Sequence, residues 1–269
     1  MMVERFRVAA VQTVSSGEVE ANLQAIEPLV AEAAHQRARL IVLPEYFGIL
    51  GARASDKVAV REEEGAGPQQ AFLARLSREY GIWLVGGTVP IAIADPQRVR
   101  SALLVYGPDG ARVARYDKIH LFAFHQGDER YDEGRTIEPG AEPASFEAPC
   151  GRVALSVCYD LRFPELYRRF ADLALILVPS AFTVVTGAAH WHVLLRARAI
   201  ENQSYVLAAA QGGLHPNGRR TYGHSVIIDP WGEIIAERDE GPGVIFADID
   251  PERLAQVRRE LPALQHRRL

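Results

Sequence analysis

Short runs of Val, Ile and Leu alternate with longer segments of helical periodicity along most of this chain, and that alternation limits the folds open to it. Continuous apolar runs of this length are typical of strands buried on both faces. They occur at residues 6–12, 40–43, 82–89, 153–158 and 173–178. Helical spacing of apolar residues follows at 18–34, 72–80, 164–170 and 190–202. Alternating strands and helices predict an α/β layered domain.

Two tight turns modify this prediction. Residues 107–110 (Gly-Pro-Asp-Gly) and 230–232 (Pro-Trp-Gly) each separate two strand-like runs, as in a β-hairpin. We therefore expect a mixed sheet, or two sheets. No repeat or Pro/Ser-rich linker marks a boundary, so residues 1–269 are predicted to form a single domain. The polar stretch 122–134 lacks clear periodicity and is predicted to be a functional loop rather than a simple connector.

Composition and charge exclude several kinds of partner. The chain has 269 residues, a formal net charge of -4 and 48% hydrophobic residues, so no overall positive field attracts nucleic acid or an anionic membrane surface. Residues 1–13 lack the features of a signal peptide, and no apolar run reaches membrane-spanning length. We therefore expect a cytoplasmic enzyme. In a reducing compartment, a disulfide between Cys150 and Cys158 is a poor explanation for these two cysteines.

Three polar side chains end apolar, strand-like runs abruptly. Glu45 follows residues 39–44, Lys118 follows 111–117 and Cys158 follows 152–157. Reacting groups in open α/β sheets tend to lie just past the carboxyl ends of strands. A base, a cation and a nucleophile are therefore predicted at strand ends. Read singly, Glu45 is better explained as a strand-end carboxylate in solvent or in an ion pair, and Lys118 can be a surface lysine. No histidine has a context that distinguishes it as a partner for cysteine.

Cys158 precedes a tight turn and Pro164, a residue suited to the first turn of a helix. A thiol facing a helix N-terminus, with an ammonium nearby, is expected to have a lowered pKa and to be reactive. The alternative is a small buried hydrophobic residue, which most free cysteines are. Cys150, in an apparent turn between Pro149 and Gly151, is predicted to be structural.

The joint pattern resembles the nitrilase superfamily of carbon-nitrogen hydrolases, and the resemblance covers essentially the whole chain. It rests on three motifs in the family's order: Leu43-Pro44-Glu45, residues 116–122 (Tyr-Asp-Lys-Ile-His-Leu-Phe) and residues 158–166 (Cys-Tyr-Asp-Leu-Arg-Phe-Pro-Glu-Leu). The resemblance implies a four-layer αββα sandwich that dimerises. It also implies roles for four residues: Glu45 as general base, Lys118 as the group stabilising the tetrahedral intermediate, Cys158 as nucleophile and Glu133 as an assisting glutamate that positions the lysine.

A mechanism follows as a hypothesis. Glu45 takes the Cys158 proton, the thiolate attacks an amide carbon, and the Lys118 ammonium and the Tyr159 backbone N–H meet the oxyanion. Water then hydrolyses the thioester. Lys118 is expected to matter for rate more than for folding. No metal or cofactor is required by this mechanism. His190 and His192 are two residues apart on a predicted helix, so their side chains diverge rather than converge on one ion.

Residues 179–203, 219–225 and 264–268 most closely resemble the branch that contains deaminated glutathione amidase, with omega-amidase as its neighbour. Substrates of both branches carry carboxylates, so the resemblance implies a cation in the pocket. Candidate substrate-binding residues are Phe182, Thr186, His190, Arg130, Arg135 and Arg219. For each arginine a solvated surface position is an equal alternative, and an aromatic residue at 182 is often part of a core.

Two other classes compete with the amidase. A non-catalytic binding protein on the same fold is expected to lose one of Glu45, Lys118 and Cys158, and all three are present. A zinc hydrolase needs His and carboxylate ligands at coordinating spacing, for which the sequence gives little support. Family analogy predicts a homodimer, with contacts through residues 190–202 and the tail 262–269.

Overall fold

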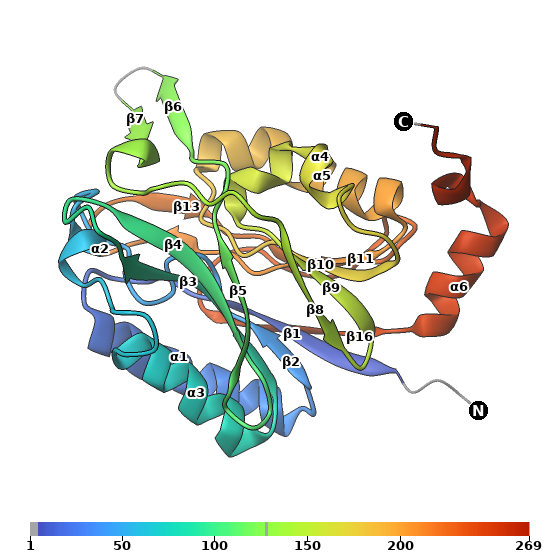
Figure 1. The fold of residues 1–269 in the computed structure, drawn as a ribbon, viewed down its shortest axis with the longest axis horizontal. Coiled ribbons are helices and arrows are strands. Elements are labelled where there is room, and N and C mark those ends of the chain that lie inside the picture. Colours follow the sequence, from blue (N-terminus) through green and yellow to red (C-terminus); the bar gives the residue numbers. More distant parts are fainter. Residues whose placement is uncertain (1–4, 127–128, 269) are drawn as a thin grey trace.

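The computed structural model describes residues 5–126 and 129–268, and its core is two six-stranded mixed sheets packed face to face (Figure 1). The first sheet has the order β16-β1-β2-β3-β4-β5. Its strands are β1 (Phe6–Gln12), β2 (Leu40–Val42), β3 (Trp83–Ala92), β4 (Val99–Tyr106), β5 (Arg112–Asp117) and β16 (Gly243–Ile249). Helices α1 (Val19–His35) and α3 (Pro68–Tyr80) cover its outer face.

The second sheet has the order β15-β14-β11-β10-β9-β8. Its strands are β8 (Ala144–Ala148), β9 (Gly151–Leu155), β10 (Leu173–Leu177), β11 (Tyr205–Ala208), β14 (Ser225–Ile228) and β15 (Ile234–Arg238). Helices α4 (Pro164–Tyr167) and α5 (Val184–Asn202) lie on its outer side. The predicted four-layer αββα sandwich is therefore confirmed.

Smaller elements complete the chain. Two hairpins stand apart from the main sheets: β6 (Ala123–Gln126) with β7 (Glu129–Asp132), and β12 (Gly212–Leu214) with β13 (Arg220–Tyr222). The remaining helices are α2 (Asp56–Ala59), α6 (Pro251–Glu260) and the 3-10 turns η1 (Glu133–Arg135), η2 (Cys158–Arg162) and η3 (Ala263–His266). Among the described residues, no helix is long and apolar enough to cross a membrane.

Alternation of side chains along each strand produces the layers. In β1, Val8 and Ala10 belong to the core between the two sheets. Their neighbours Ala9 and Val11 belong to the second core cluster, on the side of helix α1, together with Ile26. Because successive side chains of a strand point to opposite faces, a strand in this position must be apolar on both. That requirement explains the continuous apolar runs of the sequence.

Most predicted elements are confirmed, and three differ in extent or kind. Helix α5 starts earlier than predicted because Thr183 caps it, accepting a hydrogen bond from the Thr186 N–H. Helix α4 starts at Pro164, as predicted, but ends at Tyr167, earlier than predicted. The predicted functional loop at 122–134 contains the β6–β7 hairpin, paired from Ala123–Asp132 to Gln126–Glu129, followed by η1. Strands of four residues are too short to show periodicity.

The strands that lead to Glu45 and Cys158 belong to parallel sets, whereas β5, which leads to Lys118, pairs antiparallel with β4. Strands β1, β2 and β3 are parallel, as are β9, β10 and β11. The carboxyl ends of parallel strands lie at one edge of a sheet, and in an open α/β sheet this edge is the usual place for a site. The Thr13–Gln211 bridge links the two sheets just past the ends of β1 and β11.

Candidate active site

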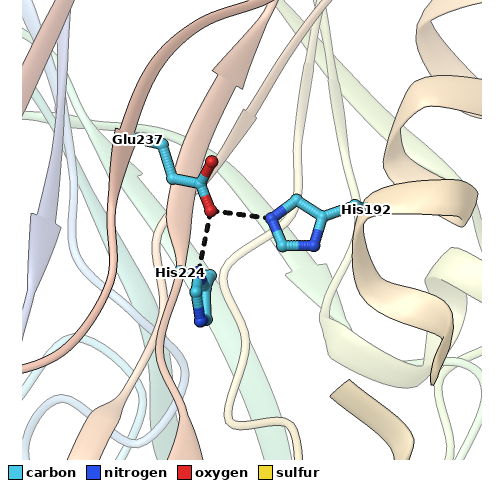
Figure 2. Close-up of side chains that lie close together, drawn as sticks. All are labelled: His192, His224 and Glu237. Carbon is cyan, nitrogen blue, oxygen red and sulfur yellow. Dashed lines mark hydrogen bonds and ion pairs between the residues drawn. The ribbon is translucent and has the colours of Figure 1, made fainter. Parts of the chain in front are cut away.

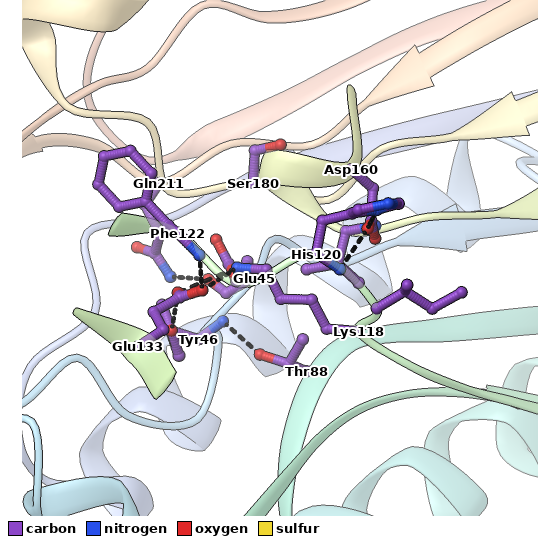
Figure 3. Close-up of polar contacts among 12 residues, drawn as sticks. Glu45, Tyr46, Thr88, Lys118, His120, Phe122, Glu133, Asp160, Ser180 and Gln211 are labelled. Atoms are coloured by element: carbon purple, nitrogen blue, oxygen red, sulfur yellow. Dashed lines mark hydrogen bonds and ion pairs between the residues drawn. The ribbon is translucent and has the colours of Figure 1, made fainter. Parts of the chain in front are cut away.

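The three predicted strand-end residues converge in the interior. Glu45 follows β2, Lys118 follows β5 directly, and Cys158 opens η2 after β9, so two come from the first sheet and one from the second. All three are buried. Glu133, on η1, joins them from beside the β6–β7 hairpin (Figure 3). The structure thus places the three predicted residues near one another, and their catalytic roles stay a prediction.

Lys118 is held by two carboxylates. Its Nζ donates to Glu45 Oε1 at 2.8 Å and to Glu133 Oε1 and Oε2 at 2.9 and 2.7 Å. The Lys118 side chain is 0% exposed. Burial alone would lower the pKa of Lys118, but the charges of Glu133 and Glu45 raise it well above its ordinary value. The side chain is therefore a permanently charged ammonium.

The environments of the two glutamates separate their pKa values. Burial, the largest effect, raises the pKa of Glu45, and the Lys118 ammonium offsets this only in part. Burial acts in the same direction on Glu133, but Lys118 and hydrogen bonds from the Phe122 N–H and the Tyr46 hydroxyl, both at 2.7 Å, lower the pKa of Glu133. Carboxyl groups separated in this way take different roles. Glu45 suits proton transfer, and Glu133 suits a fixed anion.

The backbone of Cys158 forms a strained turn. Its φ is 50°, a left-handed value that non-glycine residues adopt rarely. Its N–H donates to Pro179 O at 3.0 Å, which ties the turn to the loop after β10. This geometry places the thiol within the electrostatic influence of Glu45, whose charge acts on the pKa of Cys158.

The predicted lowering of the thiol pKa is wrong. Burial and the Glu45 charge raise the pKa of Cys158 well above its ordinary value, and the Lys118 ammonium does not compensate. The residue opens a 3-10 turn of five residues rather than a long helix, so little helix dipole faces it. A resting thiol of this kind needs a base, and Glu45 lines the same cavity and is close enough for its charge to act on the thiol.

Asp160, which sequence reasoning missed, holds the turn that carries Cys158 in place. It is fully buried and accepts hydrogen bonds from the Tyr116 hydroxyl at 2.8 Å, the His120 N–H at 3.0 Å and the Val157 N–H at 2.8 Å. These contacts join the end of β5, which carries Lys118, to the turn that carries Cys158. The signal was its place two residues after the cysteine, but an aspartate in a turn usually faces solvent.

Glu45 is positioned by close backbone packing. A Cβ atom on Gly87 would lie 2.2 Å from Pro44 O, so only glycine lets β3 approach the turn that carries Glu45. Thr88 Oγ1 accepts from the Tyr46 N–H at 3.0 Å, and Gln211 Nε2 donates to Glu45 O at 3.0 Å. The first of these contacts comes from the same sheet and the second from the loop after β11.

A cavity of about 460 Å³ opens over these residues, a volume typical of small-molecule sites. Glu45, Glu133 and Cys158 line it, and four cations line it as well: Arg53, Lys57, Arg130 and Arg219. Two of these, Arg130 and Arg219, are predicted from the sequence. Arg53 and Lys57 are not: Arg53 lies just before α2 and Lys57 within it, and a helix of four residues carries no pattern that distinguishes it from ordinary surface.

Other predicted pocket residues lie elsewhere. Arg135 lines a neighbouring cavity of about 980 Å³ that shares Arg130 with the first. Phe182 and Thr186 line a small pocket of about 10 Å³ beside Cys158. His190 is exposed on α5, lines none of these three cavities, and contacts Arg162 at 3.2 Å. It therefore lies outside the site that Cys158 faces.

A buried thiol beside a lysine and two carboxylates, on an αββα sandwich, is the arrangement of a hydrolase that acts on carbon-nitrogen bonds. The family model described as carbon-nitrogen hydrolase matches residues 7–259. The chain belongs to that family.

Several relatives resemble the whole chain. The deaminated glutathione amidase of Synechocystis sp. is 40% identical, over 97% of this chain and 98% of that protein. The omega-amidase NIT2 of Danio rerio is 37% identical, over 99% and 96%. The crystal structure of the C. elegans NitFhit protein superposes with a TM-score of 0.90 at 36% identity, covering 100% of this chain and 66% of that one.

Proposed function

We propose that this carbon-nitrogen hydrolase cleaves the amide of a small carboxylate-bearing substrate through a thioester on Cys158, and that the substrate is deaminated glutathione. One observation carries the proposal. The thiol, the ammonium and two carboxylates with separated pKa values lie together at a cavity lined by four further cations. The first four groups can carry out amide cleavage, and the further cations can bind the carboxylates of the substrate.

In the first half-reaction, Glu45 accepts the proton of the Cys158 thiol while the sulfur adds to the amide carbon. The carbonyl electron pair moves onto oxygen, where one N–H bond of the Lys118 ammonium and the backbone N–H of Tyr159 stabilise the charge. Collapse of this intermediate breaks the carbon-nitrogen bond, and the leaving amine takes the proton from Glu45. The thioester remains on Cys158.

In the second half-reaction, Glu45 accepts a proton from water, and the oxygen adds to the thioester carbon. Collapse releases the carboxylic acid and returns the proton to the sulfur. Glu133 stays ionised throughout and holds Lys118 in place, because its lowered pKa disfavours protonation. Glu133 is in this account a positioning residue rather than a proton carrier.

The cations around the cavity support a substrate with a carboxylate at each end. Arg219 stacks over the Tyr131 ring at 4.9 Å and Lys57 lies over the Tyr46 ring at 5.3 Å, so both are held near the cavity. Deaminated glutathione has a keto acid at one end and a glycine carboxylate at the other. A short keto-amide, such as the α-ketoglutaramate or α-ketosuccinamate of omega-amidase, has only the first and is the alternative substrate.

Product release from deaminated glutathione, α-ketoglutaramate and an aliphatic nitrile tests the substrate. We expect the highest kcat/KM with deaminated glutathione. Arg219→Ala is expected to raise its KM about tenfold with little change in kcat, because a charged hydrogen bond to the substrate is lost. Arg220→Ala is the matched control, since the Arg220 guanidinium binds Glu240 at the surface.

The other outcomes of that assay decide between the alternatives. Preference for α-ketoglutaramate makes the enzyme an omega-amidase. Cleavage of the nitrile moves it to another branch of the family. No turnover of any of the three favours a non-catalytic binding protein.

We also propose a cytoplasmic homodimer. Both cysteines are free, which agrees with a reducing compartment, and α5 leaves Val193 69% exposed and Ile200 47% exposed. The tail 262–269 follows Leu261, which is also exposed. Light scattering is expected to give twice the chain mass, and Val193→Asp to give a monomer. Val113→Asp, at an exposed position on β5, should leave the dimer intact.

A further inference from the structure

Two imidazoles and a carboxylate meet at His192, His224 and Glu237 (Figure 2). His192 comes from α5, His224 from the connection between β13 and β14, and Glu237 from β15. Glu237 Oε1 lies 2.7 Å from His192 Nε2 and 2.7 Å from His224 Nδ1. One ligand atom from each of the three residues lies within 4.8 Å of the others.

The position of His224 is fixed by its surroundings. Trp191 Nε1 donates to its carbonyl at 2.8 Å, and its own N–H donates to Asp239 O at 2.8 Å. The Tyr222 ring stacks on its imidazole at 4.3 Å between centroids. Its φ of 54° is a strained value that these contacts maintain. The group is therefore organised before any ligand binds.

We propose that His192, His224 and Glu237 form a binding site for a divalent transition metal ion, with zinc as the best fit. Two imidazole nitrogens and a carboxylate oxygen are a ligand set that zinc uses. Binding requires both facing ring nitrogens to be free of protons, so the two N–H contacts to Glu237 give way to metal bonds and the protons go to solvent.

The geometry is close to what zinc requires. With metal bonds of about 2.0–2.1 Å, tetrahedral ligand atoms lie about 3.3 Å apart. Each 2.7 Å contact to Glu237 must therefore open by about 0.6 Å, and the two imidazole nitrogens, which lie within 4.8 Å of each other, must reach the same spacing by side-chain rotation. The three side chains are 23–29% exposed, so solvent can reach the ion. Asp239 Oδ1, 3.6 Å from His224 Nδ1, is available as a fourth ligand, as is water.

The site is distinct from the proposed catalytic centre. None of its three ligands lines the cavity above Cys158. Instead it bridges helix α5, strand β15 and the connection before β14, so a bound ion cross-links three separate parts of the second sheet and its helix layer. We expect zinc to raise the melting temperature without taking part in amide cleavage.

Calorimetric titration of the chelator-treated full chain with zinc tests the proposal. We expect one ion per chain, with the affinity lowered at least tenfold in His192→Ala and in Glu237→Gln. His190→Ala is the matched control, because His190 lies on the same helix, exposed, and contacts Arg162 instead. The affinity of this control should match that of the unchanged protein. Circular dichroism checks that each variant is folded.

Cys158→Ala separates this site from the thiol, which could itself bind zinc. The expected result is unchanged zinc binding in Cys158→Ala and weakened binding in His192→Ala. The proposal is overturned if folded His192→Ala and Glu237→Gln bind zinc as the unchanged chain does, if binding disappears with Cys158, or if the unchanged chain binds none.

Discussion

Cys158→Ala is expected to lower kcat for amide hydrolysis by about 10⁴-fold or more while leaving the protein folded. The sulfur forms the covalent intermediate, and loss of a nucleophile removes a whole reaction path rather than one stabilising contact. Alanine takes less space than cysteine and removes no charge, because the raised pKa keeps the buried thiol protonated. Steady-state kinetics with the preferred substrate, together with a thermal melt, measure both effects.

Cys150→Ala is the matched control for this prediction. Cys150 is also buried, and burial raises its pKa to about 12, but it lies in the turn before β9, away from the carboxyl end that leads to Cys158. We expect near-normal turnover from Cys150→Ala. Turnover in Cys158→Ala within a few fold of the unchanged protein would falsify the thioester mechanism.

Lys118→Met is expected to harm both rate and stability. It removes a donor to the oxyanion, which costs about 10²- to 10³-fold in kcat. It also leaves Glu45 and Glu133 buried without their cation, which lowers the free energy of unfolding by about 3 kcal/mol. From the sequence alone, Lys118 is expected to affect mainly the reaction rate. Because Lys118 is completely buried between two carboxylates, we expect an effect on stability as well. Chemical denaturation measures the change in the free energy of unfolding.

A second substitution, at Glu133, tests whether the unpaired buried carboxylates cause the loss of stability. Adding Glu133→Gln to Lys118→Met removes an unpaired buried charge, so the double variant should recover part of the stability but none of the rate. Lys57→Met is the control for stability alone, because Lys57 is the only other lysine in the chain and its side chain, half-buried at the cavity edge, is proposed to contact the substrate. If the double variant is less stable than Lys118→Met alone, the charge-burial explanation is wrong.

Strand ends were predictable because they depend on local pattern. A run that is apolar on both faces ends where a polar residue must leave the core, and this places Glu45, Lys118 and Cys158 within a few residues of β2, β5 and β9. The motifs around them also identify the family, which the match to residues 7–259 confirms. The place of Glu133 was harder to predict from the sequence, because it follows two short strands that show no periodicity.

The sequence by itself determined the layered architecture and the order of the strand-end residues, since both depend on spacing along the chain, and its motifs resemble those of the family. Only the tertiary structure decided the ionisation of the site. Burial and neighbouring charges, which depend on distances between remote segments, raise the pKa values of Cys158 and Glu45 and lower that of Glu133. The same holds for the cluster of His192 with His224 and Glu237, three residues that no local pattern connects.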